Sequence, residues 1–227
     1  MIGEPDISRD SATLCYALYD YPDSPKVSWD YRAEDDGIHW AMVRYQGLLW
    51  IVYRGSVDKQ DWIRDFYAFY DPFLHDSLGP IHPGFYEGLP TTVEKILNFA
   101  KPDDLIGITG HSLGAGRASQ ATGLLALAGR PPITGGRAVY GEPHSGGDEL
   151  ARITAPYLGP SYRADGGPNA SWDEVDMVTA VPPWFNTPGP RTDVAVTPIP
   201  NDPWKAFRFH HMSLYAKAVG IQETWAG

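Results

Sequence analysis

The segment that most constrains the fold is a short apolar run that passes through a glycine-rich turn into a long helix of small residues. The run is "DLIGIT" (104–109), the turn is "GHSLG" (110–114), and the predicted helix covers 112–129 and ends at Gly129 before two prolines. A strand that leads directly into a helix is a building block of α/β architectures. Glycines on both sides of Ser112 let neighbouring backbone approach closely at a sharp turn. The stretch therefore predicts a strand–turn–helix unit with Ser112 at its apex.

The rest of the chain supplies elements that fit around this unit. Residues 38–53 alternate apolar and polar side chains and then become continuously apolar, with "QG" between, which predicts a β-hairpin. Apolar spacing predicts helices over 60–73, 91–101, 147–157 and 211–220, and strands over 136–143, 161–164 and 192–198. No linker or repeat interrupts the 227 residues. We expect one α/β domain with a mixed, mostly parallel sheet that carries the antiparallel hairpin at one side.

Composition excludes several classes of function. The chain has 28 acidic and 18 basic residues, a net charge of −10, which argues against a nucleic-acid partner. Cys15 is the single cysteine, so no intramolecular disulfide can form, and no Cys/His set has metal-ligand spacing. We expect no metal and no cofactor. The start "MIGEPDISRD" shows no signal peptide and no apolar run reaches about 18 residues, so we expect a cytoplasmic protein, or one secreted without a visible signal.

The turn around Ser112 matches G-x-S-x-G in the strand-to-helix setting that gives this pattern its meaning. A dinucleotide-binding fingerprint fails because Ser119 stands where its third glycine is needed, and a phosphate-binding loop fails because no lysine follows the glycines. The helix that begins here points its first amides, including that of Leu113, at the space above the serine. The pattern therefore predicts a nucleophilic serine.

A serine nucleophile needs a histidine base and a carboxylate that orients it, in the order Ser, acid, His in α/β-hydrolases. Asp176 is the favoured acid, because apolar residues surround it in "VDMVTAVPP" and an unpaired buried charge is costly. His144 follows the serine too closely to leave room for the acid. The base is His210 or His211, which precede the last predicted helix.

Six segments, taken in order, resemble the class 3 lipase family. They are "IVYRGS" (51–56), "DWIRDF" (61–66), "IHPGFYEG" (81–88), "ITGHSLGAG" (108–116), "VYGEPHSGGDELA" (139–151) and "DMVTAVPP" (176–183). The resemblance implies an α/β-hydrolase fold with a short helical lid at about 57–75. It implies Ser112 as nucleophile, Asp176 as acid, and Ser56 with Leu113 as oxyanion donors. Because His210 stands five residues before Tyr215, the resemblance favours His210 over His211 as the base.

The resemblance also predicts what the protein acts on. It implies a monomeric lipase or esterase that cleaves a small ester or lipid, contacts a lipid interface transiently, and uses Trp62 and Phe66 of the lid to bind substrate. Within the same chemistry, a phospholipase and a feruloyl-type esterase stay open. The alternative from another class is a non-catalytic α/β-hydrolase that only binds a ligand. A serine, an acid and a histidine in the required order favour the enzyme.

Overall fold

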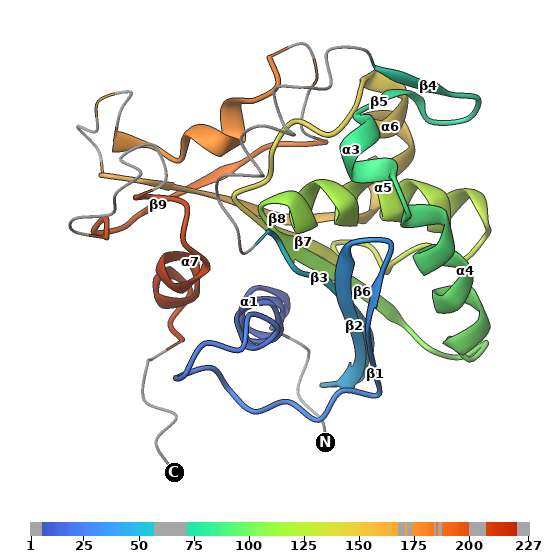
Figure 1. Cartoon of the computed structure of the whole chain (residues 1–227), viewed down its shortest axis with the longest axis horizontal. Helices are drawn as coiled ribbons and strands as arrows, with labels where there is room; N and C mark the ends of the chain where they lie inside the picture. The colour runs from blue at the N-terminus through green and yellow to red at the C-terminus, as the bar shows by residue number, and fades with distance from the viewer. Residues whose placement is uncertain are drawn as a thin grey trace.

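A seven-stranded mixed sheet organises the part of the chain that the structure, a computed structural model, describes: residues 6–56, 72–167, 171, 174–183, 185, 188–199 and 208–221. The strand order is β1-β2-β3-β6-β7-β8-β9, and β4 with β5 forms a separate hairpin (Figure 1). The elements, including the 3₁₀ helices η1 and η3, are α1 (Ile7–Ala17), β1 (Tyr31–Asp35), β2 (Ile38–Tyr45), β3 (Leu48–Tyr53), β4 (Phe73–His75), β5 (Gly79–Ile81), α3 (Pro83–Tyr86), α4 (Leu89–Phe99), β6 (Ile106–His111), α5 (Leu113–Leu127), β7 (Arg137–Tyr140), α6 (Asp148–Thr154), η1 (Ala155–Tyr157), β8 (Leu158–Asp165), η3 (Met177–Ala180), β9 (Thr192–Ala195) and α7 (Met212–Ala218).

One side of the sheet is antiparallel and the rest is parallel. β1, β2 and β3 pair antiparallel, whereas β3, β6, β7, β8 and β9 pair parallel. The β2–β3 turn places Gln46 at φ 49° and Gly47 at φ 83°, and two positive φ angles match the right-handed twist of the two strands. The predicted hairpin at 38–53 and the predicted α/β fold with a mixed, mostly parallel sheet are therefore confirmed.

Helices cover both faces of the sheet, as Figure 1 shows. All six residues of β3 are buried, and they alternate between two cores. Trp50 and Val52 face the core that contains residues of α1 and α7, whereas Ile51 and Tyr53 face the core that contains residues of α4 and α5. A strand with two covered faces must be apolar throughout, which explains the continuous apolar run in the sequence.

The parallel strands bring three chain segments to one edge of the sheet. In register, Tyr53 of β3 pairs with Gly110 of β6, and His111 of β6 pairs with Tyr140 of β7. Each strand ends there, and the chain then turns away. Ligand sites of open α/β sheets lie outside the carboxyl ends of the strands. This edge is therefore where the functional groups are expected.

Some elements differ from the sequence prediction. The sequence did not predict α1, β1 or the β4–β5 hairpin, and the helix expected over 147–157 ends at Thr154 and continues as the 3₁₀ turn η1. The predicted helix over 60–73 and the lid at 57–75 lie largely outside the described residues. Their last residues, Phe73–His75, form strand β4. Within the described ranges, no helix combines the length and the apolar character that crossing a bilayer requires.

Candidate active site

Ser112 stands at the tight turn between β6 and α5 with an unusual backbone. Its φ is 62° and its ψ is −130°, a conformation that side-chain-bearing residues rarely adopt and that costs about 1–3 kcal/mol. The neighbouring glycines are required sterically: a Cβ on Gly110 would lie 2.2 Å from the Gly114 carbonyl oxygen, and one on Gly114 would lie 2.2 Å from the Tyr53 carbonyl oxygen. The Ser112 N–H donates to the Tyr140 carbonyl oxygen at 3.0 Å. Strain held by close packing is typical of a functional turn.

His210 and Asp176 form a buried pair. Nδ1 of His210 lies 2.6 Å from Oδ2 of Asp176, and the exposed fractions of the two residues are 8% and 0%. Asp176 precedes η3, and its Oδ1 accepts the Val178 N–H at 3.0 Å. His211 is instead the N-cap residue of α7 and is partly exposed. Of the two histidines that the sequence proposed as the base, His210 is the one in contact with the proposed acid.

Contacts of His111, the neighbour of Ser112 in the sequence, place this pair close to the serine turn. The ring of His111, the residue before Ser112, stacks on the His210 ring with centroids 4.7 Å apart, and its Nε2 lies 3.0 Å from the His210 carbonyl oxygen. On the other side is Gly141, which follows Tyr140 at the end of β7 and has φ 56°. A Cβ on Gly141 would lie 2.8 Å both from Asp176 Oδ2 and from His210 Cε1. Any side chain at this position would force His210 or Asp176 to move.

Tyr215 is a contact of the acid whose role the sequence did not predict. Its hydroxyl donates to Asp176 Oδ2 and accepts the Ala164 N–H at 3.1 Å. Burial, together with the nearby Asp176 charge, raises the Tyr215 pKa well above its usual value, so the hydroxyl keeps its proton and remains a donor. The sequence indicates Tyr215 only by its position, five residues after His210. The spacing gave no sign of the contact, because 39 residues separate Tyr215 from Asp176.

The two proposed oxyanion donors come from different segments of the chain. Leu113 is the first residue of α5, where an N–H has no intrahelical acceptor. Ser56 follows Gly55 just after β3, and a Cβ on Gly55 would lie 2.9 Å from Ser112 Cβ, so this segment lies against the serine. Trp62 and Phe66, the proposed substrate-binding residues, lie outside the described residues.

An apolar cluster lies between the elbow and the acid. Buried Phe85 and Val178 pack with the partly buried Leu113 and Val181. Leu113 follows the serine and Val178 follows the acid by two positions, so the cluster adjoins both. Among the residues that the structure describes, no three His, Cys, Asp or Glu side chains gather in a way that could hold a metal ion. The arrangement suits acyl chemistry on an apolar group.

The fold and the strained serine turn define the class: this is a serine hydrolase with the α/β-hydrolase fold. A model of the lipase (class 3) family matches residues 50–184, more than half of the chain. The chain therefore belongs to the class 3 lipase family and is a carboxylic ester hydrolase. Among curated proteins, no sequence matches it.

Solved structures of fungal lipases share the fold. The triacylglyceride lipase of Rhizomucor miehei superposes with a TM-score of 0.60 at 17% identity, over 85% of this chain and 79% of that one. The mono- and diacylglycerol lipase of Aspergillus oryzae gives 0.59 at 22% identity, over 86% and 78%. A lipase of Rhizopus microsporus var. chinensis gives 0.59 at 16% identity, over 92% and 84%. At these identities the likeness concerns the fold.

Proposed function

We propose that this hydrolase cleaves uncharged acyl esters through an acyl-enzyme on Ser112, with His210 as base and Asp176 as the residue that orients it. The observation that carries the proposal is the 2.6 Å contact between His210 Nδ1 and Asp176 Oδ2, buried beside a serine in a strained turn. A carboxylate at Nδ1 holds the proton on that nitrogen. Nε2 then carries the lone pair that can accept the serine proton.

The reaction proceeds in two halves. His210 takes the Ser112 proton as the oxygen attacks the ester carbonyl, and the backbone amides of Ser56 and Leu113 donate to the oxyanion that forms. The imidazolium returns its proton to the leaving alcohol, and Asp176 stabilises the positive charge in the meantime. Water then attacks the acyl-enzyme with His210 again as base, which frees the acid and restores the serine.

The apolar cluster supports an apolar acyl group as the substrate's acid part. Leu113 and Val181 are partly buried beside the two catalytic segments, so an acyl chain can displace water from their exposed surface. A net charge of −10 opposes anionic substrates and anionic lipid surfaces. We therefore propose a neutral ester or lipid as substrate, taken from a neutral interface by a monomeric enzyme.

The test compares wild type with three variants on p-nitrophenyl butyrate and with a fluorophosphonate probe. Ser112→Ala is expected to lose turnover by about 10⁴-fold or more and to lose labelling, and His210→Ala to lose about 10³-fold or more. The matched control is His211→Ala, which removes the neighbouring imidazole and is expected to stay within about threefold of wild type. Labelling and turnover that persist in Ser112→Ala would overturn the nucleophile, and a larger loss in His211→Ala than in His210→Ala would overturn the base.

A substrate panel tests the proposed substrate. Emulsified triacylglycerols and p-nitrophenyl esters of increasing chain length are compared with phosphatidylcholine vesicles and methyl ferulate. We expect the neutral acyl esters to give the highest kcat/KM. Faster cleavage of the phospholipid or the ferulate assigns the enzyme to that class instead.

A further inference from the structure

A chain of hydrogen bonds runs behind the serine and joins segments that are far apart in the sequence. The hydroxyl of Tyr19, in the turn after α1, lies 2.6 Å from His111 Nδ1 and 3.1 Å from the Gly55 backbone nitrogen. The other ring nitrogen of His111 lies 3.0 Å from the carbonyl oxygen of His210. The mechanism above uses neither Tyr19 nor the side chain of His111.

Chemistry determines the direction of every bond in this chain. The His210 carbonyl can only accept, so the proton of the His111 ring is on Nε2. A neutral imidazole then offers Nδ1 as an acceptor, so Tyr19 must donate to it. The Gly55 N–H can only donate, and it donates to the Tyr19 oxygen. The chain thus runs from the Gly55 amide through Tyr19 and His111 to the His210 backbone.

These hydrogen-bond directions require a neutral His111 imidazole, and the surroundings of the ring keep it neutral. The residue is 4% exposed, and burial, aided by the nearby His210 and His211, holds the pKa of its imidazole well below the usual value. Burial likewise raises the pKa of Tyr19 well above its usual range, so the phenol keeps its proton. Both groups therefore stay in the protonation states that the bonds need across the neutral pH range.

The two ends of the chain are parts of the reaction machinery. Gly55 precedes Ser56, the proposed oxyanion residue, and a Cβ on Gly55 would lie 2.7 Å from the His111 carbonyl oxygen. The far end is the backbone of the proposed base, whose ring also stacks on His111 at 4.7 Å. In the amino-acid sequence, His111 directly precedes the proposed nucleophile, Ser112. One tyrosine and one histidine therefore contact the segments that carry the oxyanion donor, the nucleophile and the base.

We propose that Tyr19 and His111 are positioning residues for ester hydrolysis, which set the oxyanion segment after β3 and the backbone of His210 relative to Ser112. This inference rests on the proposed function, because it assigns the two residues to that triad. Placement of reacting groups is worth far more in the transition state than in the ground state, so a small displacement lowers kcat while substrate binding changes little.

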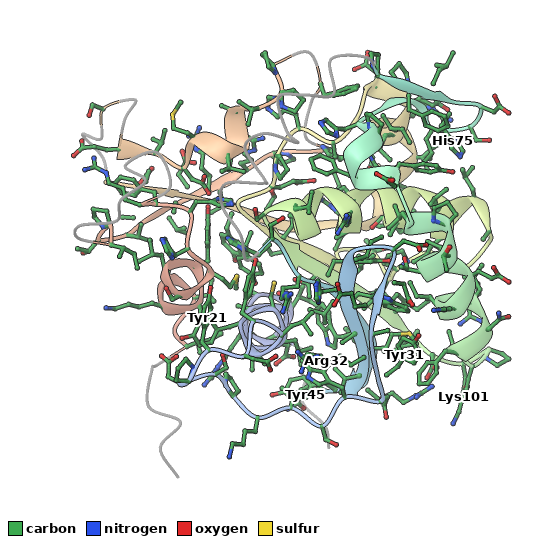
Figure 2. The ribbon with its side chains drawn as sticks, in the orientation of Figure 1. Tyr21, Tyr31, Arg32, Tyr45, His75 and Lys101 are labelled. Carbon is green, nitrogen blue, oxygen red and sulfur yellow. The ribbon has the colours of Figure 1, made fainter. Side chains whose placement is uncertain are left out.

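Tyr19→Phe is the informative variant, and Tyr21→Phe is its matched control. Phenylalanine at position 19 keeps the ring, which stacks on Tyr21 with centroids 5.3 Å apart, and removes only the hydroxyl. Tyr21, labelled in Figure 2 beside α1 and α7, lies in the same aromatic group but takes no part in the hydrogen-bond chain. We expect Tyr19→Phe to lower kcat about 10- to 100-fold with KM within about twofold, and Tyr21→Phe to leave both unchanged.

A second pair of variants tests the histidine. His111→Phe removes both of its bonds and is expected to lose more kcat than Tyr19→Phe. In His111→Gln the amide group can donate to the His210 carbonyl and its oxygen can accept from Tyr19, so partial recovery is expected relative to His111→Phe. If Tyr19→Phe gives no folded protein, the comparison of His111→Gln with His111→Phe decides: a glutamine variant with no higher kcat than the phenylalanine variant overturns the inference.

Inhibition by an alkyl trifluoromethyl ketone distinguishes a positioning role from a merely structural one. This compound forms a tetrahedral oxyanion adduct on the serine. We expect its inhibition constant to rise in proportion to the loss of kcat/KM across the series. A kcat of Tyr19→Phe or His111→Phe within twofold of wild type, or an equal loss in Tyr21→Phe, overturns the inference. So does an inhibition constant that does not follow kcat/KM. If instead Ser112→Ala keeps activity, it is the proposed function that fails, which separates the two failures.

Discussion

Asp176 is a carboxylate with no exposed surface that accepts hydrogen bonds from three donors. They are the Val178 N–H, the His210 ring and the Tyr215 hydroxyl. Burying a charge costs several kcal/mol unless donors replace its water, so each of these contacts has an energetic role. Unlike the other two donors, the Tyr215 hydroxyl also accepts a hydrogen bond, from the Ala164 N–H of β8. It thereby connects the acid to the sheet.

Tyr215→Phe tests this connection at the scale of one hydroxyl. Its loss leaves the acid with two donors and leaves the Ala164 N–H without its acceptor. We expect kcat to fall about 10-fold or more and the free energy of unfolding to fall by about 1–3 kcal/mol. Ester turnover and urea unfolding measure the two effects, with Tyr45→Phe, at the turn end of β2, as a control. Full activity with reduced stability would show that the hydroxyl serves folding alone.

At the scale of elements, the sequence and the structure agree best where a pattern is local. The strand, the turn and the helix around Ser112 were predicted within two residues of β6 and α5, because glycine spacing and apolar periodicity act over a few residues. Helix α1 was missed for a physical reason. Its buried positions include the polar residues Asp10, Ser11 and Thr13, so the sequence does not show the apolar face that predicts a helix. Ser11 is instead accommodated by a 2.7 Å hydrogen bond to the Tyr140 hydroxyl.

Asp10 makes the stability of α1 dependent on pH. Desolvation, and secondarily the Asp6 charge, raises its pKa to about 6, so the folded state binds a proton more tightly than the unfolded chain. Its stabilising contribution is complete below the unfolded value near 3.8 and is lost as the pH rises through about 6. We expect Asp10→Asn to be more stable than wild type by about 1–2 kcal/mol at pH 7.5 and by much less at pH 4.5.

The measurement is the difference in free energy of unfolding between variant and wild type at several pH values. The first turn of a helix favours a negative charge by about 0.3–1 kcal/mol, which reduces the gain at high pH without changing its direction. A difference that stays constant from pH 4.5 to pH 7.5 would contradict the raised pKa.

At the scale of the whole molecule, the single cysteine can be used to test whether the protein unfolds as one domain. Cys15 of α1 is fully buried in the core shared by α1, the sheet and α7, and burial raises the pKa of its thiol. A thiol reagent therefore reaches it only when this core opens. We propose that residues 1–227 form one domain, in which this core and the active site unfold together.

The expected outcome is that Cys15 labelling, tryptophan fluorescence and ester turnover share one midpoint in urea. Labelling of the native enzyme should be slower than labelling of the unfolded chain by about 10³-fold or more, since it requires the opening reaction. Labelling with a lower midpoint than the loss of turnover would show that α1 opens as a separate unit.

The sequence by itself determined the order of elements in the central part of the chain, the class of fold and the identity of Ser112 as the residue in the strained turn. These features depend on residue type and on spacing over a few residues, so they can be recognised in the amino-acid sequence alone. It also indicated Asp176, since a charge among apolar residues requires a partner.

Only the tertiary structure decided the contacts that complete the site. Adjacent residues leave the backbone in different directions, so packing alone determines that His210, and not His211, lies 2.6 Å from Asp176. Tyr19 and His111 meet across 92 residues, and their contact depends on how α1 packs against the sheet. A hydrogen bond forms only within a few tenths of an ångström of its ideal length. Sequence spacing cannot specify positions to that accuracy, whereas a close-packed fold can.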